Sequence, residues 1–92
     1  MVNANTSLVP LTAEYGPESI EGYYDEVFSI PPMLELIARE VDNRAVDGVV
    51  VGCFDDTGID AARCLIDAPV IGICQAAMQT AATLAGSFSV VT

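Results

Sequence analysis

The chain has 92 residues, enough for one small domain with a modest core. Apolar residues make up 52% and charged residues 17%, which is typical of a globular rather than a disordered chain. Thirteen acidic and three basic residues give a net charge of −10. This charge argues against a nucleic-acid partner, because binding phosphates requires clustered Lys and Arg side chains.

The cysteine count and the start of the chain restrict the compartment and the metal chemistry. No basic segment followed by an apolar one opens the sequence, so no secretory signal is expected and the predicted location is cytoplasmic. Three cysteines in such a chain indicate free thiols rather than a disulfide framework. With no histidine and no zinc-like cysteine spacing, no metal is expected. The uncharged residues 68–92 could span a bilayer by length, but Pro, Gly, Gln, Thr and Ser interrupt them, so no membrane partner is expected.

The first half of the chain predicts an irregular strand, a loop and a helix. Residues 8–12 are apolar but contain a proline, which indicates at best an edge strand. Residues 15–26 are polar and contain glycine, and they predict a loop. The prolines at 31 and 32 are expected to open a helix, because proline is tolerated in a first turn. Apolar residues at helical spacing over 33–41 continue it.

The second half alternates strands with helices: strand 49–52, helix 57–66, strand 69–73, helix 75–85 and strand 88–91. The runs at 49–52 and 69–73 are typical of strands buried on both faces. Thr57 and Asp60 fit a capping box, and Gly86 is expected as a C-cap. This order predicts an α/β fold with a parallel sheet of about four strands and right-handed crossovers.

Two cysteines are expected at one edge of that sheet. Ligands gather at the carboxyl ends of parallel strands, where Cys53 and Cys74 both fall. Cys53 would face the N–H groups of the next helix, which favour an anion. Asp55 and Asp56 oppose a second negative charge unless Asp56 acts as a helix cap. Cys64, within a helix, is interpreted as a small packed residue.

A thiol at a strand end can act as a nucleophile or can transfer protons. Nucleophilic thiols commonly use a histidine partner, which the chain lacks, and no Cys-x-x-Cys supports a redox role. Proton transfer needs only a suitable thiol and a second acid–base group on the other face of the substrate. From the residues alone, an unreactive cysteine at this place is about as plausible as a functional one.

Four segments in order, "GPESIEGYYDEVFSIPPMLELI", "DGVVVGCFDDTGIDAARCL", "APVIGICQAAM" and "SFSVVT", resemble the hydantoin racemase branch of the Asp/Glu racemase superfamily. The resemblance implies cofactor-independent racemisation of 5-substituted hydantoins by two cysteines, one on each face of the chiral carbon. Cys53 matches the first of these. Backbone N–H groups around Phe54 and Asp55 are candidates to stabilise an enolate. Gln75, where the family usually has Glu, is expected to contact the substrate.

The resemblance also implies a chain truncated at both ends, which makes the Asp/Glu racemase-like domain incomplete. Residues 1–86 are interpreted as a partial first α/β domain and 87–92 as a last strand that could start a missing second domain. The second catalytic cysteine of the family lies in that other domain, at a place that neither Cys64 nor Cys74 matches. The chain would therefore carry one half of a site, would be inactive alone and would form a homo-oligomer in its full-length form. A non-catalytic remnant and an allantoin or amino-acid racemase are the alternatives.

Overall fold

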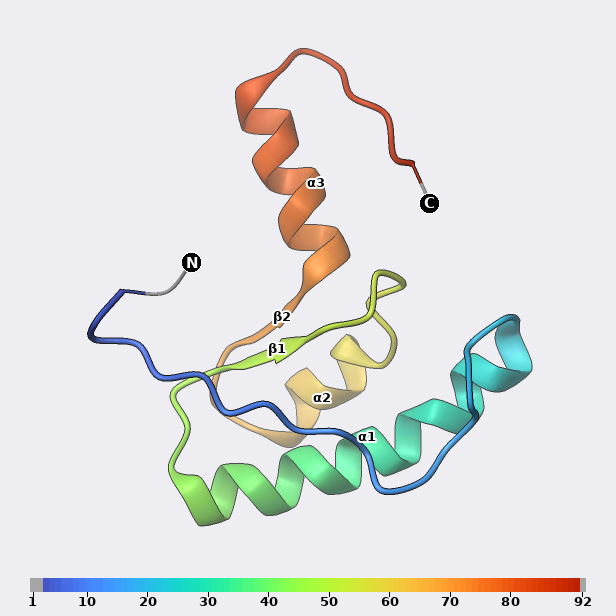
Figure 1. The fold of residues 1–92 in the computed structure, drawn as a ribbon, viewed down its shortest axis with the longest axis vertical. Coiled ribbons are helices and arrows are strands. Elements are labelled where there is room, and N and C mark those ends of the chain that lie inside the picture. The colour runs from blue at the N-terminus through green and yellow to red at the C-terminus, as the bar shows by residue number, and fades with distance from the viewer. Residues whose placement is uncertain (1–2, 92) are drawn as a thin grey trace.

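The protein, described here by a computed structural model over residues 3–91, folds into three helices and two strands within that range. The elements follow one another as α1 (Tyr23–Arg44), β1 (Val49–Val51), α2 (Ile59–Leu65), β2 (Val70–Gly72) and α3 (Ile73–Leu84). β1 and β2 are parallel and α2 connects them, as Figure 1 shows. The predicted α/β class with a parallel sheet is confirmed.

The sheet is smaller than predicted. Within residues 3–91 it has two strands, and the segments 8–12 and 88–91 form none. A strand needs a neighbour to pair its backbone groups, and neither segment has one among the described residues. Pro10 also removes one of the N–H donors that pairing of the first segment would use.

Helix α1 begins earlier than predicted, and its two prolines lie inside it. The helix starts at Tyr23, where the N–H of Glu26 donates to the carbonyl of Gly22 over 3.0 Å. The prediction that Pro31 and Pro32 open this helix is therefore wrong. Interior prolines remove backbone hydrogen bonds. Pro32 is buried, so its packing offsets part of this cost.

The core joins α1, α2 and one face of the sheet. Its buried residues are Ile37, Val51, Ile59, Ala62 and Val70. The opposite face of the sheet is bare, since Val50 is 62% exposed and Ile71 is 48% exposed. The prediction that both strands are buried on both faces is therefore wrong for the described chain, where no helix covers the second face.

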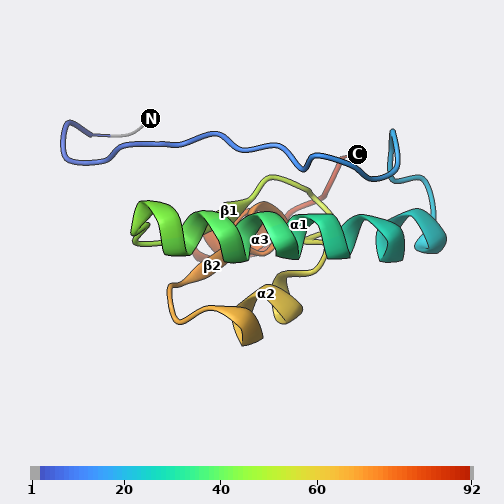
Figure 2. The same ribbon diagram turned by 90° about the horizontal axis from the view of Figure 1, so that it is seen from below.

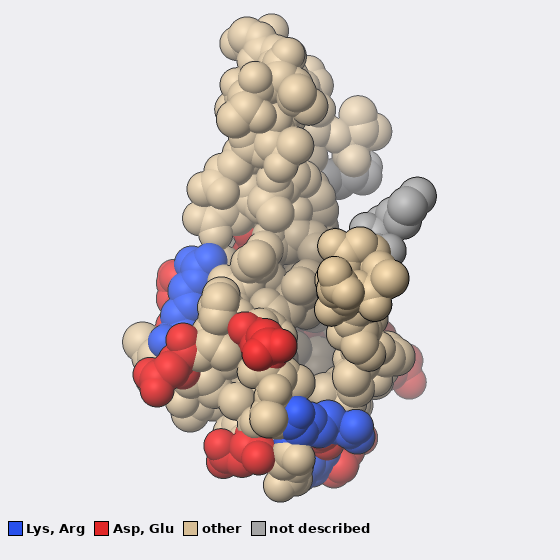
Figure 3. All heavy atoms as spheres, turned by 90° about the vertical axis from the view of Figure 1, so that its left-hand side faces the viewer, with Lys and Arg blue, Asp and Glu red and all other residues tan. Residues whose placement is uncertain are grey.

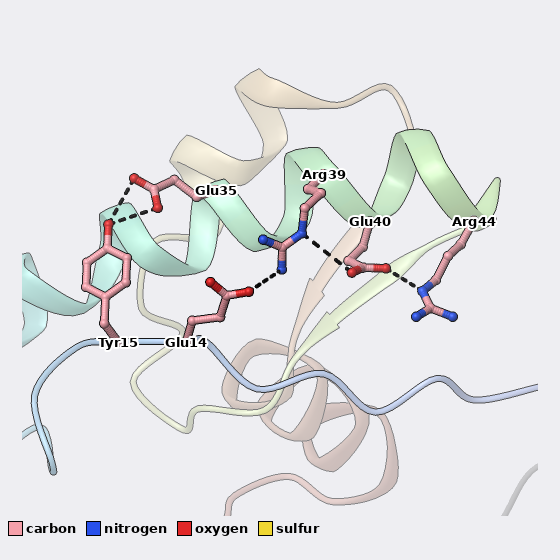
Figure 4. A network of polar contacts seen from close by, with 6 residues as sticks. All are labelled: Glu14, Tyr15, Glu35, Arg39, Glu40 and Arg44. Atoms are coloured by element: carbon pink, nitrogen blue, oxygen red, sulfur yellow. Dashed lines mark hydrogen bonds and ion pairs between the residues drawn. The ribbon is translucent and has the colours of Figure 1, made fainter.

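The N-terminal segment runs along α1, as Figures 1 and 2 show. Polar contacts tie it there: the hydroxyl of Tyr15 donates to both carboxylate oxygens of Glu35 at 2.9 Å, and Arg39 pairs with Glu14 at 3.1 Å. Figure 4 shows how this network continues along α1 through Glu40 and Arg44. These contacts are mostly exposed, so each contributes little to stability.

Helix α3 leaves the sheet and projects away from the core (Figure 1). None of its residues is buried. It ends at Leu84, after which Ala85 is extended, so the predicted C-cap at Gly86 is wrong. On the face drawn in Figure 3 the charged side chains gather at the end opposite α3. No helix within residues 3–91 combines the length and apolarity needed to cross a membrane.

Candidate active site at the carboxyl ends of the strands

Two thiols follow the two strands at the same edge of the sheet. β1 ends at Val51, two residues before Cys53, and β2 ends at Gly72, two residues before Cys74. Val51 lies opposite Gly72 in the parallel pair, so both cysteines lie at the carboxyl edge, as predicted. Cys53 is half-buried and packs against the core, whereas Cys74 lies in the first turn of α3.

The thiol of Cys53 contacts a buried hydroxyl. Its Sγ atom lies 3.3 Å from Oγ1 of Thr57, a residue that is 3% exposed. Either atom can donate, so the hydroxyl can serve both a thiol and a thiolate. The capping box predicted at Thr57 is wrong, because α2 starts at Ile59 and no side chain caps it. Sequence reasoning missed the contact between Thr57 and Cys53, and the spacing of four residues was its only signal.

The turn after Cys53 presents backbone donors. The N–H of Asp56 donates to the carbonyl of Cys53 over 2.9 Å, and the N–H of Ile59 donates to the carbonyl of Asp56 over 3.3 Å. These bonds close the turn without using the N–H groups of Phe54 and Asp55. Both residues are exposed. Among residues 3–91, neither of these two N–H groups donates a hydrogen bond.

Asp56 joins the two strand ends. Its Oδ1 accepts a hydrogen bond from the N–H of Cys74 over 2.9 Å, and its Oδ2 accepts one from the N–H of Gln75 over 2.8 Å. A carboxylate at the first turn satisfies backbone donors that the helix leaves unpaired. Asp56 is thus a helix cap, as the sequence suggested, but it caps α3 after β2 rather than the helix that follows it in the chain.

Two glycines allow this close packing. A Cβ on Gly72 would lie 2.2 Å from Oδ1 of Asp56, so a side chain at that position would displace the carboxylate. Gly58 has φ +71, and a Cβ there would lie 2.7 Å from Cε of Met33. The turn also holds Asp56 at φ 53, in the left-handed region that costs most residues energy. The loop that contains Asp56 therefore packs too closely against Met33 and Gly72 to admit a side chain at position 58 or 72.

Arg63 holds the side chain of Gln75. Its guanidinium donates to Oε1 of Gln75 over 2.9 Å and to the carbonyl of Val70 over 3.1 and 3.0 Å. Because the amide oxygen of Gln75 is engaged, its NH2 group is the part that can donate to a ligand. Sequence reasoning missed this role, although Arg63 is the only basic residue after position 44.

The other two cysteines differ from Cys53 in their surroundings. Partial burial raises the pKa of the Cys74 thiol, and the carboxylates of Asp56 and then Asp55 raise it further. Cys74 is therefore held more firmly in its neutral form than an ordinary thiol. Cys64 is exposed on α2, so its interpretation as a packed residue is wrong. The helix turns Ile59 and Ala62 toward the core instead.

The predicted site residues thus fall into a linked group and a looser pair. Cys53 and Gln75 are joined through the loop and the carboxylate of Asp56. Phe54 and Asp55 lie beside them on the exposed turn. A groove of about 400 Å³ along α3 includes Gln75 in its lining but not Cys53. Within residues 3–91 no three thiol or carboxyl side chains gather in a way that could hold a metal ion.

Comparison with known proteins gives a consistent result. The family model described as Asp/Glu/Hydantoin racemase matches residues 2–92. A hydantoin racemase of Pseudomonas sp. (strain NS671) is 43% identical over 97% of this chain and 35% of its own length. One from Rhizobium meliloti is 53% identical over 83% of this chain and 31% of its own. The chain thus spans about a third of the length of these curated relatives.

A solved structure agrees with the sequence comparisons. The allantoin racemase from Klebsiella pneumoniae superposes with a TM-score of 0.72 at 44% identity, covering 77% of this chain and 29% of that protein. The model of the family covers the whole sheet edge that carries Cys53, Asp56 and Gln75. On the family match, the identities and the shared fold, the chain belongs to the Asp/Glu/hydantoin racemase family.

Proposed function

We propose that Cys53 supplies one of two acid–base groups in the cofactor-independent racemisation of 5-substituted hydantoins, and that this chain carries one half of that site. One observation carries the proposal: the half-buried thiol at the carboxyl end of β1, 3.3 Å from the hydroxyl of Thr57. The names of the curated relatives support the substrate class.

The chemistry requires proton transfer on both faces of one carbon. C5 of a hydantoin bears a hydrogen next to a ring carbonyl. When a thiolate removes that proton, the electron pair moves into the carbonyl and leaves an enolate oxygen. A thiol on the opposite face then returns a proton to C5, which inverts the centre. The first sulfur ends protonated and the second ends as a thiolate, so the two exchange roles in the reverse direction.

The neighbours of Cys53 have roles that suit this reaction. The hydroxyl of Thr57 orients the sulfur and can donate to it as a thiolate. The N–H groups of Phe54 and Asp55 would donate to an enolate oxygen beside the thiol. The NH2 group of Gln75, whose oxygen is held by Arg63, can donate to a ring carbonyl. Asp56 keeps these groups at fixed relative positions.

The second thiol is proposed to come from outside these 92 residues. Cys64 is exposed on α2, away from the carboxyl edge. Cys74 has a raised pKa through partial burial and two carboxylates, and its N–H is bound to Asp56. Inversion needs a group on each face, so we expect the 92-residue chain alone to leave a chiral hydantoin unchanged.

Allantoin is a second candidate substrate, favoured by the structural similarity to an allantoin racemase. It is itself a hydantoin with a ureido group at C5, so the same proton transfer applies. The two candidates differ in what must surround the C5 substituent: a ureido group needs hydrogen-bond partners, whereas an alkyl group needs apolar contacts.

The test uses a full-length host. The matching third of the Rhizobium meliloti hydantoin racemase is replaced by this chain, and loss of optical rotation is followed for an L-5-alkylhydantoin and for (S)-allantoin. We expect Cys53→Ser to lower the rate by at least a thousandfold with the fold intact by circular dichroism, while Cys64→Ser retains activity. A Cys53→Ser variant with more than a tenth of the activity would refute the assignment. If the chimera with the unaltered chain had a native fold but no activity, that result would favour a non-catalytic remnant.

A further inference from the structure

The turn that follows Cys53 holds a second carboxylate beside that of Asp56. The N–H of Asp56 donates to the carbonyl of Cys53 over 2.9 Å, which closes a turn over residues 53–56. Such a turn keeps the Cα atoms of its first and last residues within about 7 Å of each other. Asp55 is the third residue of this turn and is exposed. The local backbone therefore holds Asp55 near Cys53, whatever else packs against this edge of the sheet.

The two carboxylates of the turn differ in their partners. Asp56 accepts hydrogen bonds from the N–H groups of Cys74 and Gln75 over 2.9 and 2.8 Å. None of the ion pairs among residues 3–91 involves Asp55. The charge of Asp56 is thus used to cap α3, whereas the charge of Asp55 faces no cation in the described part of the chain.

The basic residues of the chain are all engaged elsewhere. There are three of them, Arg39, Arg44 and Arg63. Arg39 and Arg44 both pair with Glu40 on α1. The guanidinium of Arg63 donates to a carbonyl of β2 and to the side chain of Gln75. The turn beside Cys53 therefore carries a negative charge that no side chain of this chain neutralises.

This charge acts across the carboxyl edge of the sheet. Asp55 follows β1 and Cys74 follows β2, yet Asp55 contributes to the raised pKa of Cys74, after partial burial and Asp56. A ligand beside Cys53 would meet the same negative potential. A carboxylate on that ligand would be repelled, whereas a neutral group in its place would not.

We propose that Asp55 is a specificity-determining residue of the Cys53 site, which disfavours 5-substituted hydantoins whose side chain ends in a carboxylate relative to those whose side chain is neutral. The hydantoin ring itself is uncharged near neutral pH. Two like charges about 6 Å apart in a water-exposed site change an association constant about threefold. The inference rests on the proposed function, because it requires that C5 of the substrate lies beside Cys53.

The first test compares two substrates of one shape in the chimera with the Rhizobium meliloti hydantoin racemase. They are 5-(2-carboxyethyl)hydantoin and its primary amide, which differ by one charge. We expect Asp55→Asn to lower the ratio of kcat/KM for the amide to kcat/KM for the acid about threefold at about 20 mM salt, and less at about 0.5 M salt. Asp67→Asn is the matched control and should leave the ratio unchanged, because Asp67 is exposed before β2, at the opposite end of the strands.

The second test needs no racemase activity. A thiolate displaces iodide from both iodoacetamide and iodoacetate, and the two reagents differ by one charge. A change in the pKa of the thiol affects both rates equally and cancels in their ratio. In the 92-residue chain, the ratio of iodoacetamide to iodoacetate labelling at Cys53 should fall about threefold in Asp55→Asn and stay unchanged in Asp67→Asn. The ratio at Cys64, near the far end of α2, should not respond to Asp55→Asn.

Circular dichroism checks that each variant keeps its fold. An unchanged labelling ratio at Cys53 in Asp55→Asn would overturn the proposal, and so would an unchanged substrate ratio in an active chimera. An equal fall in Asp67→Asn would also overturn it, because the effect would then be one of net charge. Cys53→Ser separates this proposal from the proposed function: racemisation that survives Cys53→Ser refutes the role of Cys53. If Cys53→Ser is inactive but Asp55→Asn leaves both ratios unchanged, only the role of Asp55 is refuted.

Discussion

The segment from α1 to β2 and the segment from α3 onward differ in how they are held. The first contains all five residues of the buried core and every charged side chain after the N-terminal segment. The second contains no buried residue in its helix and no charge. Asp56 connects the two through hydrogen bonds to the first turn of α3. The comparison teaches that Cys53 is built on the packed segment from α1 to β2, whereas α3 is held by polar contacts: the carboxylate of Asp56 and the bond from Arg63 to Gln75.

The largest expected effect comes from shortening a core side chain in the segment from α1 to β2, which we call the packed half. Ile37→Ala should cost about 2–5 kcal/mol, because Ile37 is 7% exposed and its removal leaves a cavity in a small core. A domain of this size has about 5 kcal/mol or less in reserve, so we expect the cooperative urea transition to be lost. Leu84→Ala, at an 82% exposed position of α3, is the matched control and should change stability by less than about 0.5 kcal/mol. Equal losses of stability in Ile37→Ala and Leu84→Ala would contradict the difference between the packed half and α3.

The next largest effect is expected from substituting Asp56, whose hydrogen bonds connect the packed half to α3. Asp56→Ala should destabilise the fold by about 1 kcal/mol through loss of a helix cap. Burial is the larger cause of the raised pKa of Cys74 and the charge of Asp56 is the next. Asp56→Asn keeps an acceptor but removes that charge, so the pKa should fall part of the way toward its ordinary value of 9.0. Asp55→Asn should shift it in the same direction by less, because its effect is the smaller of the two. Iodoacetamide labelling of Cys74 against pH, read by peptide mass spectrometry, measures both shifts. An unmoved profile in Asp56→Asn contradicts the assigned cause.

Thiol accessibility gives a finer comparison within the packed half. Cys64 is exposed on α2 and Cys53 is half-buried against the core, so at equal pH Cys64 should be alkylated faster. Thr57→Val keeps the shape at the buried position but removes the hydroxyl that contacts Cys53, and it should alter the labelling rate of Cys53 while leaving that of Cys64 unchanged. Faster labelling of Cys53 than of Cys64 in the unaltered chain would contradict a labelling order set by exposure alone.

The smallest effect concerns the exposed network that holds the N-terminal segment. Hydrogen bonding to Glu35 raises the pKa of Tyr15, so this contact stabilises the fold below pH 10 and is lost as pH rises through the raised pKa. Bonding to Arg44 lowers the pKa of Glu40, so that contribution is present above pH 4.5 and is lost as pH falls through the lowered pKa. Tyr15→Phe should flatten only the alkaline side of the urea midpoint plotted against pH, and Glu40→Gln only the acidic side.

Much of the packed half could be predicted from the sequence because its signals are local. The β-branched runs predict strands at 49–52 and 69–73, and the structure has them at Val49–Val51 and Val70–Gly72. Alternation of strands with helices then predicts a parallel sheet with Cys53 at its carboxyl edge, which is where it lies. The rule that ligands gather at this edge depends only on the order of strands and helices, and the sequence predicts that order.

The rest depends on partners distant in the chain. Asp56 bonds Cys74, 18 residues later, and no local pattern identifies which helix a carboxylate caps. Proline has a low helix propensity, and Pro32 is buried inside α1 through tertiary packing, which the local sequence does not indicate. The apolar run at 49–52 predicts burial on both faces, but whether a covering element is present cannot be read from the run itself. Val50 is exposed for that reason.

The close approach of Gly72 to Asp56 has a consequence for engineering. The two positions are sixteen residues apart in the chain, yet a single added methyl group at 72 would meet the carboxylate at 2.2 Å. Substitutions at 56 and 72 should therefore be strongly non-additive, and a library that varies one position alone would sample mostly variants with a displaced loop. Attempts to redesign specificity around Cys53 should treat these positions as one unit and choose their residues together.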